Sequence, residues 1–352
     1  MEDLELNFWK DKNVFVTGHT GFKGSWLCKI LYDLGASVSG LSLPLSDENR
    51  LFTNIVEEHT KQSYFGDISN EIFLQETLDE VKPEIIFHLA AQPLVMDSYK
   101  DPITTFETNI TGTAKLIYYA SKLKNLKSLV NVTSDKCYAN NNLSTPFIES
   151  DPMGGNDPYS ASKGCAEIIS NSLVSSFISK TNIKLANVRA GNVIGGGDYS
   201  KNRLLPDIIR AIDKGTNLII RSPDAIRPWQ HVLEPLFGYL EIAEGLYFGS
   251  EDYTGGWNFG PELVDCISVK SVLDIVSKNE TNFLYTIESQ SLNLESQMLR
   301  LDINKAKNNL KWSPKWSAEQ AIGKTIEFYK RQIDGEEAAT IVSDQIQDYK
   351  GK

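Results

Sequence analysis

The sequence predicts an α/β fold, a doubly wound parallel sheet joined to a smaller C-terminal lobe. In the first half of the 352 residues, short apolar runs alternate with helical patterns. This alternation is typical of a parallel sheet with a crossover helix after each strand. A glycine-rich turn links the first apolar run to the first helical pattern, and the alternation ends near Gly191. We therefore expect the sheet before residue 191 and most of the smaller lobe after it.

Six short, mostly apolar strands are expected, because strands covered by helices on both faces are buried on both sides. They span residues 13–17, 37–41, 64–65, 84–89, 128–132 and 184–188. Helical patterns fit residues 22–34, 102–123 and 159–179. In the smaller lobe we expect helices at 204–214, 235–247 and 268–277, followed by a polar, loosely docked tail from Asp334.

Composition argues against several classes of protein. The net charge is −11 and no Lys/Arg cluster stands out, so a nucleic-acid partner is not expected. No run reaches the ~18 apolar residues of a membrane span, and Met1–Glu5 does not open a secretory leader. Cys28, Cys137, Cys165 and Cys266 form no CxxC pair. We therefore expect no metal site and no disulfide framework, and a cytoplasmic location.

The turn after the first strand has the pattern GxxGxxG, with glycines at 18, 21 and 24. Gly18 permits a tight turn, Gly21 lets the backbone approach a pyrophosphate, and Gly24 lets the helix pack on the strand. The following helix offers free N–H groups to that anion. The loop therefore predicts a dinucleotide site formed by Gly18, Thr20, Gly21, Phe22, Lys23 and Gly24.

The end of the second strand bears on the choice of dinucleotide. It reads Gly40-Leu41-Ser42-Leu43-Pro44, with no acidic residue to bind an adenosine ribose and no Arg to receive a 2′-phosphate. Ser42 can hydrogen-bond a ribose hydroxyl, and NAD is favoured over NADP. Asp67, beside Ile68, either reaches the adenine amine or caps a helix beginning near Ser69. Residues 1–190 are accordingly predicted to form an NAD-binding, Rossmann-type domain, with residues 191–352 mainly binding substrate.

A catalytic site is indicated by Tyr159 and Lys163, which lie four residues apart on one helix face. An ammonium beside a phenol lowers the pKa of the phenol, and such a tyrosine can exchange the proton of a substrate hydroxyl during hydride transfer. The fifth strand ends at Thr133-Ser134, so one of these hydroxyls is expected to contact the same substrate oxygen.

Together these residues resemble the extended short-chain dehydrogenase superfamily, in which the equivalents of Ser134 or Thr133, Tyr159 and Lys163 form the catalytic set. Six longer stretches resemble the sugar-nucleotide 4,6-dehydratases that act on CDP-glucose. They are Gly18–Trp26, His88–Val95, Val132–Tyr138, Asp151–Glu167, Arg189–Asp198 and Ala225–Pro235.

This resemblance implies an NAD-dependent hydro-lyase that converts CDP-D-glucose to CDP-4-dehydro-6-deoxy-D-glucose and water, for deoxysugar and polysaccharide synthesis. C4 is oxidised, C5–H and C6–OH are eliminated, and the hydride returns to C6. Asp135 matches the acid that protonates the departing hydroxyl, provided that burial raises its pKa. Lys136 stands where dTDP-glucose enzymes carry Glu, and either acts as a neutral base at C5 or stabilises an enolate as an ammonium.

The resemblance also implies binding residues and an oligomer. Leu89, Ala90, Ala91 and Gln92 are expected to border NAD, and Asn109 to support the nucleotide or the catalytic loop. Asn192 and Arg227 match contacts to the phosphates of the substrate. Arg203 is either a second cation there or a surface charge at a helix start. Relatives pair through two helices, which implies a homodimer or homotetramer.

Three other functions remain open from sequence. A sugar-nucleotide 4-epimerase shares the fold, NAD and the Tyr/Lys pair, but does not need Asp135 and Lys136. An NADPH-dependent reductase consumes its cofactor stoichiometrically. An NAD-sensing binding protein has no turnover, and the intact Ser/Tyr/Lys set argues against it.

Overall fold

The first lobe is built on a seven-stranded parallel sheet, in a computed structural model that describes residues 8–46, 50–140, 145–280, 282–288 and 298–351. The strand order is β11-β6-β5-β4-β1-β2-β3. The strands are β1 (Asn13–Thr17), β2 (Ser37–Ser42), β3 (Gln62–Phe65), β4 (Ile85–His88), β5 (Ser128–Val132), β6 (Lys184–Ala190) and β11 (Gly255–Phe259). Because β1 lies between β2 and β4, strand order reverses there, and ligands bind outside the carboxyl ends of strands at such a point. The predicted doubly wound parallel sheet is confirmed.

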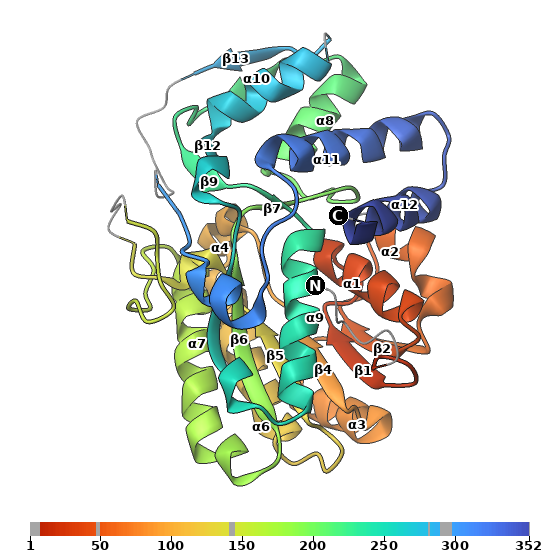
Figure 1. The fold of residues 1–352 in the computed structure, drawn as a ribbon, viewed down its shortest axis with the longest axis vertical. Helices are drawn as coiled ribbons and strands as arrows, with labels where there is room; N and C mark the ends of the chain where they lie inside the picture. Colours follow the sequence, from red (N-terminus) through yellow and green to blue (C-terminus); the bar gives the residue numbers. More distant parts are fainter. Residues whose placement is uncertain (1–7, 47–49, 141–144, 281, 289–297, 352) are drawn as a thin grey trace.

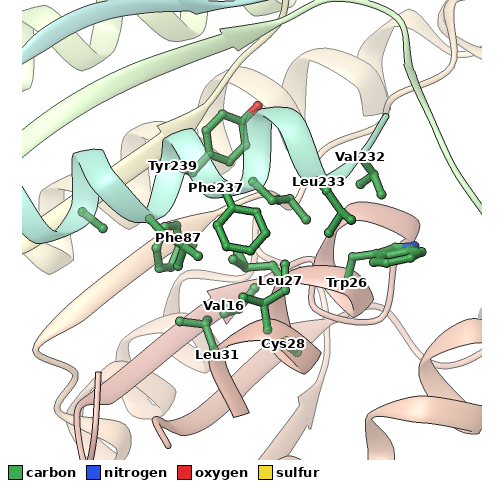
Figure 2. Close-up of a cluster of buried hydrophobic side chains, with 14 of the residues drawn as sticks. Val16, Trp26, Leu27, Cys28, Leu31, Phe87, Val232, Leu233, Phe237 and Tyr239 are labelled. Carbon is green, nitrogen blue, oxygen red and sulfur yellow. The ribbon is translucent and has the colours of Figure 1, made fainter. Parts of the chain in front are cut away.

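Side chains alternate between two cores on the two faces of the sheet. In β1, Val14 and Val16 join one core while Phe15 joins the other. The first core is closed by α1 (Phe22–Asp33) and α9 (Leu233–Tyr247), and Figure 2 shows side chains of both helices meeting over the sheet. The second core is closed by α3 (Glu71–Val81), α6 (Thr113–Ala120) and α7 (Pro158–Ser176). Burial on both faces explains why strands in the middle of the sheet, such as β1 and β4, are largely apolar.

The long helix expected at 102–123 is divided. It begins as α5 (Pro102–Phe106), continues through a π-helical segment over Glu107–Gly112, and ends as α6 at Ala120. A shorter helix, α4 (Val95–Lys100), precedes it. Both α4 and α5 pack against α7.

The smaller lobe is assembled from short strand pairs and helices around its own core. Its helices are α8 (Leu204–Lys214), α10 (Val269–Asn279) and α11 (Ala318–Ile333), which gather at the top of Figure 1. Its strand pairs are β7–β10 (Val193–Ile194 with Gln230–His231), β9–β12 (Ile226–Pro228 with Cys266–Ser268) and β8–β13 (Leu218–Ile220 with Tyr285–Ile287). Between these segments the chain returns to the first lobe, where α9 covers the sheet and β11 pairs with β6.

The expectation of a loosely docked tail from Asp334 is wrong. Residues Ala338–Gly351 form α12, which packs against α2 (Arg50–Ile55) of the first lobe. Ile341, Val342, Ile346 and Tyr349 are fully buried in the core that also contains β1 and α1. The tail looks polar because only one face of α12 is apolar, as in any amphipathic surface helix.

Candidate active site

A cavity of about 1650 Å³ opens at the carboxyl ends of β1, β4, β5 and β6, between the sheet and the smaller lobe. Its walls include the glycine loop, the segments that follow β2, β4 and β5, the start of α7, and loops of the smaller lobe. The cavity therefore lies at the point where the strand order reverses, beside β1. The structure thus brings the predicted cofactor, catalytic and substrate residues to one cavity, with two exceptions described below.

Each of the three glycines in the loop is suited to its position for a different physical reason. Gly18 adopts φ +74°, and a Cβ there would lie 2.7 Å from the Ala90 nitrogen. A Cβ on Gly24 would lie 2.1 Å from the Gly18 carbonyl oxygen, so Gly24 lets α1 pack on the loop. A Cβ on Gly21 would meet only the Gly18 oxygen, at 3.4 Å, so the space around it is open. Gly21 is the N-cap of α1 and supplies no capping side chain. The bare first turn and the open space at Gly21 fit a pyrophosphate.

At the end of β2, Ser42 lines the cavity, but its hydroxyl is already engaged. Ser42 Oγ lies 2.9 Å from His19 Nδ1 and accepts from the Thr20 N–H at 3.3 Å. Burial lowers the pKa of His19 to about 4, so this imidazole is neutral at pH 7. The Ser42 oxygen thus helps to order the glycine loop. Its hydrogen bond to a ribose stays a prediction.

Asp67 and Ile68 line the same end of the cavity. The alternative that Asp67 caps a helix is wrong, because α3 is capped by Asn70, which accepts from the Phe73 N–H. Asp67 instead accepts from the Ser69 N–H at 2.7 Å. Its exposed carboxylate stays available to a ligand.

The pair on α7 is positioned by the way this helix begins. Asp157 caps α7 by accepting from the Ser160 N–H at 2.9 Å, and Pro158 occupies the first turn. Tyr159 and Lys163 then follow on the buried side of the helix and both line the cavity. Lys163 Nζ donates to the Val132 carbonyl at 3.4 Å, and burial lowers its pKa to about 8.

The pKa of Tyr159 runs opposite to the expectation from its neighbouring lysine. Burial raises it to about 12, and Asp135 adds to this, while a hydrogen bond from Ser134 opposes the shift. In the protein without ligands the phenol is therefore protonated at neutral pH. The expected lowering towards neutrality is wrong for this state, because burial of the phenol outweighs the other effects.

The structure distinguishes between the two hydroxyls after β5. Thr133 Oγ1 donates to Glu167 Oε1 at 2.6 Å, so this hydroxyl serves the core behind the cavity. Ser134 Oγ donates to Asp135 Oδ1 at 3.1 Å, accepts from the Lys136 N–H at 3.2 Å, and lines the cavity together with Tyr159. This geometry favours Ser134 over Thr133 as the hydroxyl that meets a substrate.

Asp135 is a buried carboxyl group with one unused oxygen. It is 3% exposed, and its Oδ2 has no hydrogen-bond partner within the described ranges. Burial raises its pKa, against the opposing effects of Lys136, Ser134, Arg227 and Lys23. The direction of this shift agrees with the expectation for a carboxylic acid that must hold a proton.

Lys23 extends from the glycine loop towards the same carboxyl group. Burial lowers its pKa to about 7, and the cations Arg203 and Lys163 lower it further, whereas Asp135 raises it. Positive charge therefore gathers in the cavity before any ligand binds. An anion such as a diphosphate would relieve this repulsion.

The predicted substrate residues line the cavity on the side of the smaller lobe. Asn192 follows β6, and Arg227 lies in β9, where its guanidinium is buried and donates to the Ile226 carbonyl at 2.9 Å. Arg203 precedes α8 and pairs with Asp198 at 3.0 Å. Arg203 is thus both a helix-start residue and a wall of the cavity.

Gln92 and Asn109 are the exceptions, since neither is part of the cavity wall. Asn109 accepts from the Gln92 N–H at 2.8 Å and donates to the Gln92 carbonyl at 3.0 Å and to Ser162 Oγ at 2.8 Å. It ties the loop after β4 to α7. Leu89, Ala90 and Ala91 of that loop do line the cavity. Asn109 therefore supports the site from behind.

Sequence reasoning missed the buried ion pair beneath the site. Glu167 lies one turn beyond Lys163 on α7, and both of its oxygens accept from Arg189 on β6 at 2.7 Å. Arg189 also donates to the phenol of Tyr138 at 2.6 Å. The spacing of Tyr159, Lys163 and Glu167 was a detectable signal of one helix face. Sequence reasoning also missed the part of the cavity wall that Pro223 and Val269 form, since neither residue belongs to a recognised motif.

The match to a protein-family model decides where the chain belongs. Residues 15–325 match the model described as GDP-mannose 4,6 dehydratase. The chain belongs to this dehydratase family. The chain is also similar to the CDP-glucose 4,6-dehydratase of Salmonella typhimurium, with 43% identity over 98% of both chains.

Solved structures support the fold of this dehydratase-family chain. The UDP-glucose 4-epimerase of Thermotoga maritima superposes with a TM-score of 0.78 at 21% identity, covering 91% of this chain and 99% of that one. The UDP-glucuronic acid 4-epimerase of Bacillus cereus, in complex with UDP-glucuronic acid and NAD, gives 0.78 at 20% identity with the same coverage. At these identities the likeness is one of fold.

Two further findings concern metals and membranes. Within the described ranges, no group of three or more His, Cys, Asp or Glu side chains could hold a metal ion. None of the helices described is long and apolar enough to span a bilayer.

Proposed function

We propose that this chain is a CDP-glucose 4,6-dehydratase, which converts CDP-D-glucose to CDP-4-dehydro-6-deoxy-D-glucose and water. The observation that carries the proposal is the buried carboxyl group of Asp135, placed one hydrogen bond from Ser134 and facing the cavity that holds Tyr159. Oxidation alone needs the hydroxyl, the phenol and the lysine. A protonated carboxylic acid beside them is what loss of a hydroxyl as water requires.

The chemistry that bound NAD would supply is reversible hydride transfer, by which the hydride of C4 would be taken up and given back to C6. The bare N-terminus of α1 and the open space at Gly21 would receive its pyrophosphate. The cofactor residues are Gly18, Thr20, Gly21, Phe22, Lys23, Gly24, Ser42, Asp67, Ile68, Leu89, Ala90 and Ala91, which all line the cavity.

The chain's own residues handle the protons. As a phenolate, Tyr159 takes the proton of the 4-hydroxyl, and Ser134 holds the same oxygen in place. Asp135 protonates the 6-hydroxyl so that it leaves as water. Lys136 lines the cavity beside Asp135 and acts at C5, as a neutral base or as an ammonium that stabilises the enolate.

The nucleotide diphosphate is assigned to the cations of the smaller lobe. Arg227, Arg203 and Asn192 all line the cavity, which lies between the two lobes. A guanidinium can donate two parallel hydrogen bonds to phosphate oxygens. The assignment of cytosine as the base of the nucleotide is supported by the 43% identical relative, whose name specifies CDP-glucose.

Incubation with CDP-, dTDP-, GDP- and UDP-glucose and with GDP-mannose tests the proposal, with mass analysis for loss of water. We expect a loss of one water molecule from CDP-glucose with catalytic amounts of NAD. An epimerised sugar of unchanged mass would identify an epimerase, and stoichiometric consumption of NADPH would identify a reductase. Either result, or loss of water from another nucleotide sugar alone, would overturn the assignment.

We also propose a homodimer that pairs through α5 and α7, and a cytoplasmic location. Ile103 on α5 and Ile168 on α7 are 62% and 57% exposed, and these helices are neighbours. Large apolar side chains exposed on adjacent helices suit a subunit contact. The cysteines are all free thiols, which suits a reducing compartment. Sedimentation of wild type and Ile168→Asp tests the pairing, and an unchanged mass would refute it.

A further inference from the structure

The catalytic segment, Ser134–Lys136, is flanked by two residues that bind the same buried ion pair, Glu167 with Arg189. Before the segment, Thr133 Oγ1 donates to Glu167 Oε1 at 2.6 Å. After it, Arg189 Nη1 donates to the phenol of Tyr138 at 2.6 Å. The guanidinium also donates to both oxygens of the carboxylate, at 2.7 Å each. Thr133 and Tyr138, the two anchor residues, are therefore joined to each other through one ion pair.

The helix that carries Glu167 also carries the phenol and the lysine of the site. Tyr159, Lys163 and Glu167 follow at intervals of four residues on the buried face of α7. Lys163 Nζ donates to the carbonyl of Val132, the last residue of β5, and Glu167 binds the residue after it. Two successive turns of α7 thus hold the end of β5, directly before Ser134. The position of the catalytic segment relative to the phenol on α7 depends on these contacts.

The second anchor, Tyr138, is itself fixed from several sides. It is 1% exposed, and its hydroxyl donates to Asn258 Oδ1 on β11 at 2.6 Å. Its ring stacks on Phe147 with the centroids 4.8 Å apart, and the Arg189 guanidinium lies 4.9 Å from the ring centroid. Neither Tyr138 nor the ion pair is part of the cavity wall. Their contacts therefore act on the catalytic segment and not on a ligand.

We propose that the Glu167–Arg189 pair is a positioning element for the reaction, which fixes the catalytic segment through Thr133 and Tyr138. The inference rests on the proposed function, in which this segment and a phenol on α7 act on one sugar. Proton transfer needs its partners within hydrogen-bond reach, and a displacement of ~1 Å can slow a reaction by about 10²-fold. A carboxylate bound by two parallel hydrogen bonds is fixed in direction as well as in distance.

Stability alone does not account for these contacts. Burying two charges costs so much solvation that apolar residues of similar volume are often equally stable in place of a buried ion pair. An apolar pair could neither accept from the hydroxyl of Thr133 nor donate to the phenol of Tyr138. Both of these hydrogen bonds end on residues that flank the catalytic segment. The charges are thus used where the segment needs to be held.

The test removes the two anchoring hydroxyls and keeps the ion pair, because loss of Glu167 or Arg189 would destabilise the whole fold. Thr133→Val keeps the shape of the side chain, and Tyr138→Phe lacks only the phenolic oxygen. With CDP-glucose as substrate, each variant should lower kcat by roughly tenfold to 100-fold, with KM and the affinity for NAD almost unchanged. Thr133→Ser, which keeps the hydroxyl, should restore kcat.

Two matched variants control for a loss of stability. Thr77→Val removes a buried hydroxyl that donates to the Phe73 carbonyl at 2.8 Å within α3. Tyr349→Phe removes a buried phenol that donates to Glu234 Oε2 at 2.6 Å. Neither Thr77 nor Tyr349 is part of the cavity wall. Both variants should lower the urea midpoint about as much as the anchor variants do, and both should keep the wild-type kcat.

A wild-type kcat in Thr133→Val or in Tyr138→Phe would refute the positioning role. Equal losses of kcat in the anchor variants and the controls would refute it too, as would a Thr133→Ser variant no more active than Thr133→Val. If the wild type releases no water from CDP-glucose, the proposed function fails by itself, and the variants are compared on whichever nucleotide sugar the wild type converts. A wild type that converts none of them overturns both inferences.

Discussion

Replacing Glu167 by Gln should destabilise the protein strongly, although Glu167 does not line the cavity. Its side chain is 0% exposed and that of Arg189 is 4% exposed. Gln has the same shape, but its amide N–H groups would face the donors of the guanidinium and leave a buried cation without a counter-charge. Removing one partner of a buried ion pair costs about 3–5 kcal/mol. That is a large part of the ~5–15 kcal/mol by which a folded domain is stable.

A second ion pair on the same strand supplies the control. Lys184 of β6 pairs with Glu251, which is 74% exposed. Exposed pairs contribute only about 0–1 kcal/mol, so Glu251→Gln should change little. The measurement is the urea midpoint of tryptophan fluorescence for wild type and both variants. Equal midpoints for Glu167→Gln and Glu251→Gln would refute the reasoning, since burial is the difference between the two carboxylates.

Three other substitutions address the cavity. Tyr159→Phe should abolish oxidation of C4 while NAD still binds, as turnover and cofactor fluorescence would show; retained turnover would contradict the role. Lys23→Met should remove a pH dependence of NAD binding. Because the pKa of Lys23 is about 7, the ammonium that pairs with phosphate is lost as pH rises. The affinity of the wild type for NAD should therefore fall above pH 7 by up to about tenfold per pH unit. If wild type and Lys23→Met show the same pH dependence, Lys23 does not bind the phosphate. Arg227→Ala should weaken substrate binding by ~2–3 kcal/mol with NAD affinity unchanged, and calorimetry showing equal substrate affinity would remove Arg227 from the site.

The fold of the first lobe could be predicted because its signals are local. Each central strand is an apolar run, and the glycine loop sits between a strand and a helix. The residues of β11, by contrast, begin with Gly255 and Gly256 and give no such run. Strand β11 joins the sheet through its pairing with β6, a long-range contact that no local pattern reveals.

The candidate site was predictable for a similar reason. Ser134, Asp135 and Lys136 are consecutive, and Tyr159 and Lys163 lie on one helix turn, so two short segments carry the chemistry. What could not be predicted was the environment. The raised pKa of Tyr159 comes from burial by distant segments, which a spacing rule does not contain.

The docking of α12 onto the first lobe has a consequence for how the protein is made. The core over β1 and α1 includes Ile341, Val342 and Tyr349, among the last residues described. During synthesis from the N-terminus, the first lobe cannot close this core until α12 has left the ribosome. Domains usually complete folding one after another as they emerge. Here the two lobes must mature together, once the residues of α12 have been synthesised.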